Sequence, residues 1–305
     1  MMIPNRRTFL KSTLAGLAVA GERAYGQAPI VTTPLGDKTF LLTSAGTNVV
    51  ARPASDGLVL VDGGLADRAA DLSKAIAALP GSRPVKTLYN THWHPEQTGL
   101  NIAARRAGAV IVAHENTRLW MTTDVTRPYQ YGRDNRTIPP APKEALPTRT
   151  FYDNDVITVD GERIHAGYLL QAHTDGDIYI HFTQQNVLCI GDITSANAWP
   201  LVDWWTGGWI FGITSGLDEL LKIANADTKI VPSQGPVMTR AELAVQQKMY
   251  SAIALQLRTL LFGGRNIDDA LAARPTREFD AQMGDPKQFI QLAFQSMWGH
   301  FTPDA

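Results

Sequence analysis

Two successive blocks of short strand-like runs and helices constrain the fold of this 305-residue chain more than any other feature. In the first block, three runs rich in β-branched residues are separated by glycines, which predicts a meander of antiparallel strands. The helical repeat from Leu65 to Leu79 and the buried run from Val85 to Tyr89 then bring helix and strand into alternation. The three meander strands are predicted at Thr39 to Thr43, Asn48 to Arg52 and Leu58 to Asp62. The alternation of helix and strand continues through Ala103 to Ala107 and Ala109 to Ala113.

The second block repeats the theme, and a long helix follows it. Its predicted elements are strands at Val156 to Val159, Arg163 to Leu169, Ile178 to Thr183, Asn186 to Gly191 and Lys229 to Pro232, and a helix at Ser215 to Asn225. The long helix opens at a capping box, Thr239 with Glu242, and ends at Gly263. Two similar sets of strands and helices without a linker between them predict one α+β domain, a four-layer αβ/βα sandwich.

The first residues resemble a twin-arginine export signal. Arg6 and Arg7 precede Phe-Leu-Lys, a short apolar run follows, and Ala24-Tyr25-Gly26 has small residues at the cleavage positions. We therefore expect residues 1–26 to be a signal peptide, 27–305 to form the domain, and the protein to be periplasmic or secreted. The apolar run is too short to cross a bilayer, so no membrane partner is expected after cleavage.

Composition excludes several classes of protein. The chain is 44% hydrophobic and has a net charge of -1; loss of the signal, with four basic residues and one acidic residue, leaves -4 over 279 residues. This is typical of a globular protein and gives no electrostatic reason to bind nucleic acid. Cys189 is the only cysteine and lies in an apolar run, so it is expected in the core. Metal ligands would therefore have to be histidines and carboxylates.

Two segments lack clear periodicity. Residues 120–150 predict a long surface loop that forms a wall of a pocket, with Arg127, Arg133 and Arg136 as candidates for binding a substrate carboxylate. Residues 200–213 carry tryptophans among glycines and predict a loop whose aromatic side chains fill an edge of the core.

A histidine cluster follows the strand that ends at Tyr89. His92 and His94 are two residues apart in an extended segment, so both rings can reach one cation. His173 lies in a turn-rich loop before a predicted strand, and Asp192 closes another strand. All four residues lie at strand ends or in adjacent loops, where such folds place their sites. Histidine spacing alone supports a metal site and does not identify a family or a reaction.

The same motifs make the sequence similar to the metallo-β-lactamase superfamily. The similarity covers nearly all of the predicted domain, in the motifs 60–64, 92–101, 113–116, 171–177, 191–192 and 231–236. It implies that His92, His94 and His173 bind the first metal ion, with Asp192 beside it as a further ligand or as a hydrogen-bond partner of water. His114 falls in one of these motifs, and we expect a structural role for it. His165, His181 and His300 lack ligand spacing and are expected not to bind metal.

The chain departs from the family pattern at three positions that serve the second metal ion. Glu96 stands where Asp is usual, and Gln97 and Gln234 stand where His is usual. Amides bind zinc poorly compared with imidazole, so a mononuclear centre is expected, with one Zn²⁺ per chain. Gln97 and Gln234 are then candidates for hydrogen bonds to substrate or to each other. Glu96 is a candidate general base, unless it only stabilises the N-terminus of a helix near Thr98.

The resemblance implies a periplasmic hydrolase in which metal-bound hydroxide attacks the carbonyl of a small molecule: an ester, lactone, thioester or β-lactam. A second hypothesis is a mononuclear Fe²⁺ sulfur-oxygenase of the same superfamily, with His92, His173 and Asp192 as ligands. A third is a binding protein that keeps the fold and has lost the chemistry. All three hypotheses have a small molecule as the ligand.

Overall fold

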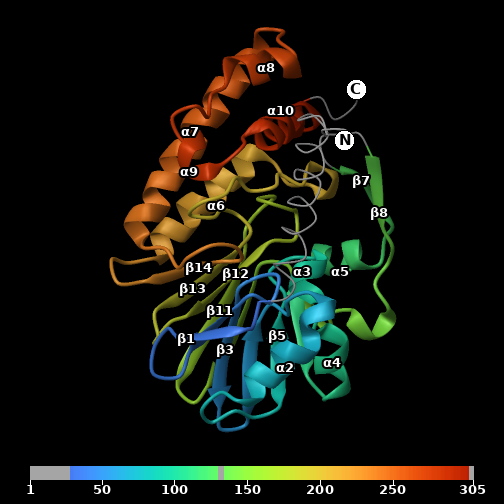
Figure 1. Cartoon of the computed structure of the whole chain (residues 1–305), viewed down its shortest axis with the longest axis vertical. Coiled ribbons are helices and arrows are strands. Elements are labelled where there is room, and N and C mark those ends of the chain that lie inside the picture. The colour runs from blue at the N-terminus through green and yellow to red at the C-terminus, as the bar shows by residue number, and fades with distance from the viewer. Residues whose placement is uncertain (1–27, 130–133, 302–305) are drawn as a thin grey trace, which may run out of the picture.

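The computed structural model describes residues 28–129 and 134–301, and places two sheets face to face (Figure 1). The first sheet has seven strands in the order β1-β2-β3-β4-β5-β6-β9. Pairs from β1 to β4 are antiparallel, and pairs from β4 through β9 are parallel. The bounds are β1 Val31–Pro34, β2 Phe40–Thr43, β3 Val49–Ala54, β4 Gly57–Val61, β5 Val85–Tyr89, β6 Val110–His114 and β9 Arg149–Phe151.

The second sheet has five strands in sequential order. All neighbours are antiparallel except β13 and β14, which are parallel because helix α6 crosses over between them. The bounds are β10 Asn154–Val159, β11 Glu162–Tyr168, β12 Ile178–Phe182, β13 Val187–Gly191 and β14 Lys229–Pro232.

Helices cover the outer face of each sheet. Against the first sheet lie α2 Ala69–Ala77 and α4 Asn101–Arg106, and against the second lie α6 Ile210–Ile223, α7 Arg240–Phe262 and α10 Lys287–Phe301. The capping box at Thr239 and Glu242 opens α7 as predicted. The remaining helical segments are η1 Ala66–Arg68, α3 Pro95–Thr98, α5 Glu115–Met121, η2 Lys143–Ala145, η3 Trp204–Thr206, α8 Ile267–Ala273 and α9 Asp280–Met283.

Alternating side chains of the strands fill the spaces between the layers. Val59 and Val61 of β4 point between the two sheets, whereas Leu58 and Leu60 point to the helices of the first half. This period of two is what a strand buried on both faces requires. The predicted four-layer αβ/βα sandwich is therefore confirmed.

Two local predictions were wrong. The segment 120–150 is not a structureless loop, because β7 Val125–Tyr129 and β8 Asp134–Ile138 form an antiparallel hairpin along one side of the molecule. Helix α6 begins at Ile210, five residues before the predicted start. Aromatic residues in these segments obscured the helical or strand period, and tertiary contacts decided the outcome.

The predicted signal peptide lies outside the residues that the structure describes. Within the described residues, no helix is both long and apolar enough to cross a membrane.

Candidate metal centre

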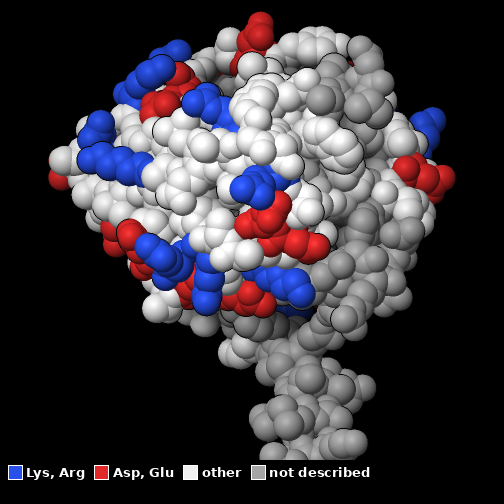
Figure 2. Space-filling model, turned by 90° about the horizontal axis from the view of Figure 1, so that it is seen from above, with Lys and Arg blue, Asp and Glu red and all other residues white. Residues whose placement is uncertain are grey.

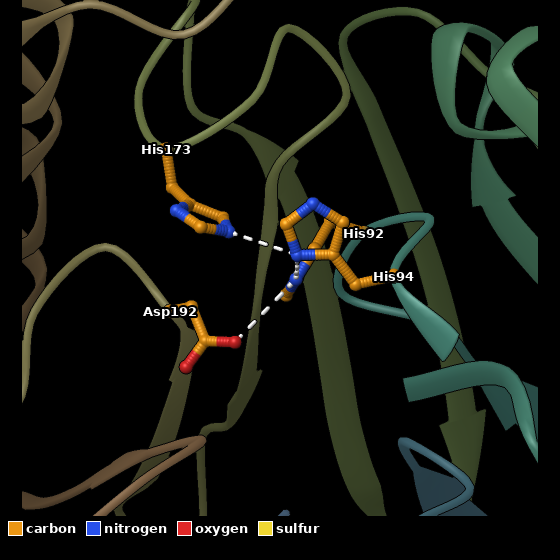
Figure 3. Close-up of side chains that lie close together, drawn as sticks. All are labelled: His92, His94, His173 and Asp192. Carbon is orange, nitrogen blue, oxygen red and sulfur yellow. Dashed lines mark hydrogen bonds and ion pairs between the residues drawn. The ribbon is translucent and has the colours of Figure 1, made fainter. Parts of the chain in front are cut away.

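His92, His94, His173 and Asp192 converge at one end of the sandwich (Figure 3). Each offers one ligand atom, and these atoms all lie within 4.8 Å of one another. The first two histidines lie between β5 and α3, His173 lies between β11 and β12, and Asp192 follows β13 directly. The site thus draws on both halves of the sandwich, and all three imidazoles are buried.

The inward nitrogens of the three imidazoles are close together. His94 Nδ1 lies 3.1 Å from His92 Nε2 and 3.2 Å from His173 Nε2. Asp192 Oδ2 lies 3.5 Å from His92 Nε2. The three rings meet edge to face, with centroids 4.6 to 4.9 Å apart, so each aims one nitrogen at a common point.

The outward nitrogens identify which ring atoms carry hydrogen. His94 Nε2 lies 2.8 Å from the buried carboxylate of Asp203, and His173 Nδ1 lies 2.5 Å from the carbonyl oxygen of Leu201. Both partners only accept, so both ring nitrogens must donate. In the neutral rings, His94 Nδ1 and His173 Nε2 therefore direct lone pairs into the site.

A buried relay sets the tautomer of His92 in the same way. Thr91 Oγ1 lies 2.9 Å from Asp62 Oδ2 and 3.1 Å from His92 Nδ1. The hydroxyl donates its hydrogen to the carboxylate, so its oxygen accepts from His92 Nδ1. Thr91 N–H also donates to Asp62. His92 Nε2 is thus the third lone pair that points inward.

This donor set fits a divalent metal ion. Three imidazole lone pairs about 3 Å apart repel one another unless a proton or a cation lies between them. Three imidazoles with one carboxylate suit Zn²⁺ and similar ions, and acceptors behind the rings are typical of metal-binding histidines. The residues present therefore fit the metal ion that the sequence predicts.

Asp192 lies in an acidic corner of the site. Burial and, to a smaller extent, the nearby Glu96 raise the pKa of Asp192 to about 8, although a hydrogen bond from Gln97 opposes the shift. A bound cation reverses this balance, because it favours the ionised form. Glu96 Oε1 lies 3.9 Å from His94 Nδ1, and its side chain is 33% exposed, so the carboxylate has access to both the site and solvent.

The helix that carries Glu96 begins earlier than predicted. Helix α3 starts at Pro95, not near Thr98, and places Glu96 in its first turn. The position suits both roles considered for this residue, stabilisation of the helix N-terminus and chemistry in the site.

Gln97 and Gln234 both use their amide groups as donors to the protein. Gln97 Nε2 lies 3.2 Å from Asp192 Oδ2 and 3.4 Å from Thr47 Oγ1, and Gln97 is completely buried. Gln234 Nε2 donates to the carbonyl of Gly46 at 2.7 Å. Where the family pattern has imidazoles, this chain thus has hydrogen-bond donors that bridge the two halves of the sandwich.

Sequence reasoning missed the groups behind the ligands. Asp203 lies in the aromatic, glycine-rich segment 200–213, where no spacing marks it as a partner of His94. The backbone of this segment lies against the His173 loop, since Asp203 N–H donates to His173 O. A Cβ on Gly208 would lie 2.0 Å from the same oxygen, so only glycine permits this approach. Asp62 lies at the end of a predicted strand and in the motif 60–64, but neither feature marked it as a partner of Thr91 and His92.

Replacement of Asp203 by asparagine or alanine tests this arrangement. Loss of the carboxylate behind His94 weakens the acceptor that holds the ring, so we expect metal affinity to fall roughly 10- to 100-fold, more for alanine than for asparagine. Competition with a chromogenic chelator measures the affinity. The control is Asp218→Asn, an exposed acid on α6. Unchanged affinity in Asp203→Ala would show that Asp203 does not support the site.

His114 has a structural role, as expected. It is the N-cap of α5: its Nδ1 accepts from Asn116 N–H, its Nε2 lies 2.9 Å from the carbonyl of Tyr152, and its ring stacks on Tyr168. Burial lowers the pKa of His114, because the charged ring is poorly solvated there and Nδ1 must stay unprotonated to accept.

His114→Asn tests the pH dependence that follows. Below pH 6.5 the unfolded chain takes up a proton at His114 that the folded chain resists, so wild type loses stability as pH falls. Asparagine also caps helices but does not titrate in this range. We expect the free energy of unfolding of wild type, relative to the variant, to fall from pH 8 to pH 5 by at most about 1.4 kcal/mol per pH unit. Urea unfolding measures it; a pH-independent difference would contradict the assignment.

The remaining sequence candidates lie apart from this cluster or outside the described side chains. Cys189 is buried in β13, as predicted. His165 and His181 face each other across β11 and β12. The backbones of Arg127 and Arg136 pair in the β7–β8 hairpin, but their side chains, like the whole of Arg133, are not among the described parts.

Comparisons with known proteins agree with this architecture. In one solved structure, the metallo-β-lactamase from Pontibacter korlensis, 99% of the chain matches 73% of this chain, with 18% identity and a TM-score of 0.58. In the metallo-β-lactamase from Hirschia baltica, 98% of the chain matches 73% of this chain, with 15% identity and a TM-score of 0.56. A stereoselective inverting sec-alkylsulfatase from Pseudomonas sp. matches 90% of this chain, with 15% identity and a TM-score of 0.63.

The match to the sulfatase spans only about half of that enzyme, 51% of its length, and at such identities all three structures establish the fold alone. A family model adds evidence from the sequence itself. It matches residues 45–235, which include every residue of the candidate centre. This chain therefore belongs to the metallo-β-lactamase superfamily.

Proposed function

We propose that this protein is a metal-dependent hydrolase that attacks the carbonyl of a small molecule, an ester, lactone, thioester or β-lactam, at a mononuclear site. The observation that carries the proposal is the set of three buried imidazoles whose inward nitrogens converge while acceptors hold the outward ones. Such a set leaves one side open for water and substrate.

The ion supplies two things when bound: it lowers the pKa of water to about 7 and polarises the substrate carbonyl. His92, His94 and His173 would hold it. Asp192 adds a carboxylate oxygen beside His92 Nε2, either as a ligand or as an acceptor for water. Glu96, at the solvent-exposed side of the site, is placed to take a proton from water and to pass it outward.

Gln97 and Gln234 support a single ion rather than two. Each amide donates its N–H group to an oxygen of the protein, Asp192 or Thr47 for Gln97 and Gly46 for Gln234. An amide binds a cation only through its oxygen, which is a poor ligand for zinc compared with imidazole. The hydrogen bond of Gln97 ties Asp192 to the first half of the sandwich, and that of Gln234 ties the loop after β14 to Gly46 of the same half.

Metal analysis and a substrate panel test the proposal. Zinc-loaded protein is expected to contain about one ion per chain, and chromogenic esters, lactones and nitrocefin test for turnover that a chelator removes. A reproducible two ions would contradict the mononuclear site. Iron with oxygen consumption on a thiol or persulfide would favour an oxygenase instead. Binding of a panel compound without turnover would favour a binding protein.

The same proposal places the enzyme in the periplasm. Its support is the Arg6-Arg7 pattern followed by an apolar run and a small-x-small site. Fractionation of cells that express the chain, with Arg6→Lys/Arg7→Lys as the matched variant, tests it: the variant is expected to remain in the cytoplasm. Equal distribution of both proteins would contradict export by this route.

A further inference from the structure

The segments that form the candidate centre contain no Lys or Arg. Six segments contribute a residue to the ligands or to their hydrogen bonds, and together they comprise 53 residues: 44–48, 62–65, 90–101, 171–177, 191–209 and 232–237. The whole chain has 28 Lys and Arg in 305 residues, which would place about five in a stretch of this size. These segments contain none.

The charges that these segments do supply are all negative. Their six acidic residues are Asp62, Glu96, Asp175, Asp177, Asp192 and Asp203. Asp62, Asp177 and Asp203 are buried under the ligands, and Glu96 and Asp192 remain partly exposed at the site itself. Burial raises the pKa of Asp62, Asp175 and Asp177, which favours their uncharged forms. The carboxylates of Glu96, Asp192 and Asp203 lie at the imidazoles themselves and offset the charge of one divalent cation. A mononuclear site in these surroundings therefore offers no attraction to an anion.

Figure 2 shows the charges on one face of the molecule, part of which is covered by residues that the structure does not describe. Lys and Arg on this face lie in small groups together with Asp and Glu, with broad uncharged areas between them. An anionic group that reaches the site would meet the partly exposed carboxylates of Glu96 and Asp192.

We propose that the site selects substrates without an anionic group, and takes neutral or cationic esters and lactones. This inference rests on the proposed function. It removes from the candidate substrates those β-lactams that carry a ring carboxylate, and nitrocefin among them, although the superfamily contains β-lactamases. Uncharged side chains would contact the substrate, and the carboxylates of the site would accept a positively charged group on it.

Three matched p-nitrophenyl esters test the selectivity, all with the same acyl length: a hexanoate, an adipate half-ester with a free carboxylate, and a hexanoate that ends in trimethylammonium. We expect kcat/KM of the zinc-loaded enzyme to be at least about tenfold higher for the neutral and cationic esters than for the anionic one. The ratio should shrink between about 10 mM and 1 M salt, as the Debye length shortens from about 30 to about 3 Å. Equal or faster turnover of the anionic ester would overturn the inference.

A charge-gain variant makes the test independent of intrinsic ester reactivity. Asn197 is exposed at the rim, where its Oδ1 lies 2.7 Å from the position of a Cβ on Gly235, next to Gln234. Asn197→Lys is expected to raise kcat/KM for the anionic ester about fivefold, and Asn197→Met, of similar length without charge, to leave it unchanged. Activity on the anionic ester that is lost in Arg127→Gln or Arg136→Gln would overturn the inference, because the hairpin would then supply the missing cation.

Binding separates this inference from the proposed function. Anilides of the same three acids resist hydrolysis, and calorimetry measures their affinity for the zinc-loaded protein. Turnover of no ester, with the neutral or cationic anilide bound at least about tenfold more tightly than the anionic one, would contradict the hydrolase and support the charge selectivity. Equal or tighter binding of the anionic anilide, or binding of none of the three, would overturn it.

Discussion

Replacement of His94 by alanine is expected to abolish metal binding and to lower kcat/KM by a factor on the order of 1,000 or more. His94 Nδ1 lies about 3 Å from both other inward nitrogens, so its loss removes the ring on which the site converges. The same change leaves Asp203 buried without the N–H that it accepts from His94. Metal content by mass spectrometry should fall from about one ion per chain to near zero after dialysis.

The control for this variant is His165→Asn, which removes a partly exposed imidazole of β11 that is not part of the cluster. It is expected to keep full metal content. Thermal unfolding gives a second measurement that does not depend on any substrate. Zinc should raise the Tm of wild type and of His165→Asn in a concentration-dependent way and should not shift His94→Ala. Metal retained by His94→Ala would contradict the three-imidazole centre.

Replacement of Arg52 by methionine is expected to cost about 3–5 kcal/mol of unfolding free energy. Arg52 of β3 and Glu162 of β11 form an ion pair of 3.6 Å between the two sheets, and both side chains are at least 97% buried. Loss of the guanidinium leaves a carboxylate without its counter-charge in the interior, because among the described residues Glu162 then keeps one hydrogen bond, from the N–H of Gln184. Chemical denaturation measures the loss.

A double variant and a surface pair serve as controls. Arg52→Met/Glu162→Gln removes both charges and keeps an acceptor for Gln184, so most of the stability should return. Lys222→Met breaks the exposed Lys222–Glu219 pair on α6 and should cost less than about 1 kcal/mol. A cost in Arg52→Met no larger than that of Lys222→Met would show that this pair contributes little to the contact between the sheets.

Strand and helix prediction succeeded wherever one period dominated. Strands β2 to β6 and β10 to β14 and the capped start of α7 were predicted to within two or three residues, because alternation and capping are local signals. Strands β1 and β9 and helix α10 were not predicted. The prediction failed in the hairpin β7–β8, where Pro, Arg and Tyr interrupt the alternation, and at the start of α6, where glycines lower the helix propensity. In both cases contacts with distant parts of the chain outweighed local preference.

The candidate ligands were visible in the sequence because each follows a strand. His92, His94, His173 and Asp192 lie after strands or between them, and the structure brings their ligand atoms together. The tautomers were not visible. They depend on Asp203, Leu201 and the Thr91–Asp62 relay, which reach the rings only after the loops have packed.

The sequence by itself determined which residue types are available to the site: three imidazoles, two amides in place of imidazoles, and loops with carboxylates and without Lys or Arg. It also determined the two-block order from which the sandwich follows, since hydrophobic periodicity is local. Only the tertiary structure decided that the inward nitrogens meet and that Gln97 and Gln234 act as donors. It also decided that the carboxylates of separate loops lie around the three imidazoles. Those properties depend on distances between segments up to 188 positions apart, and no local pattern contains such distances.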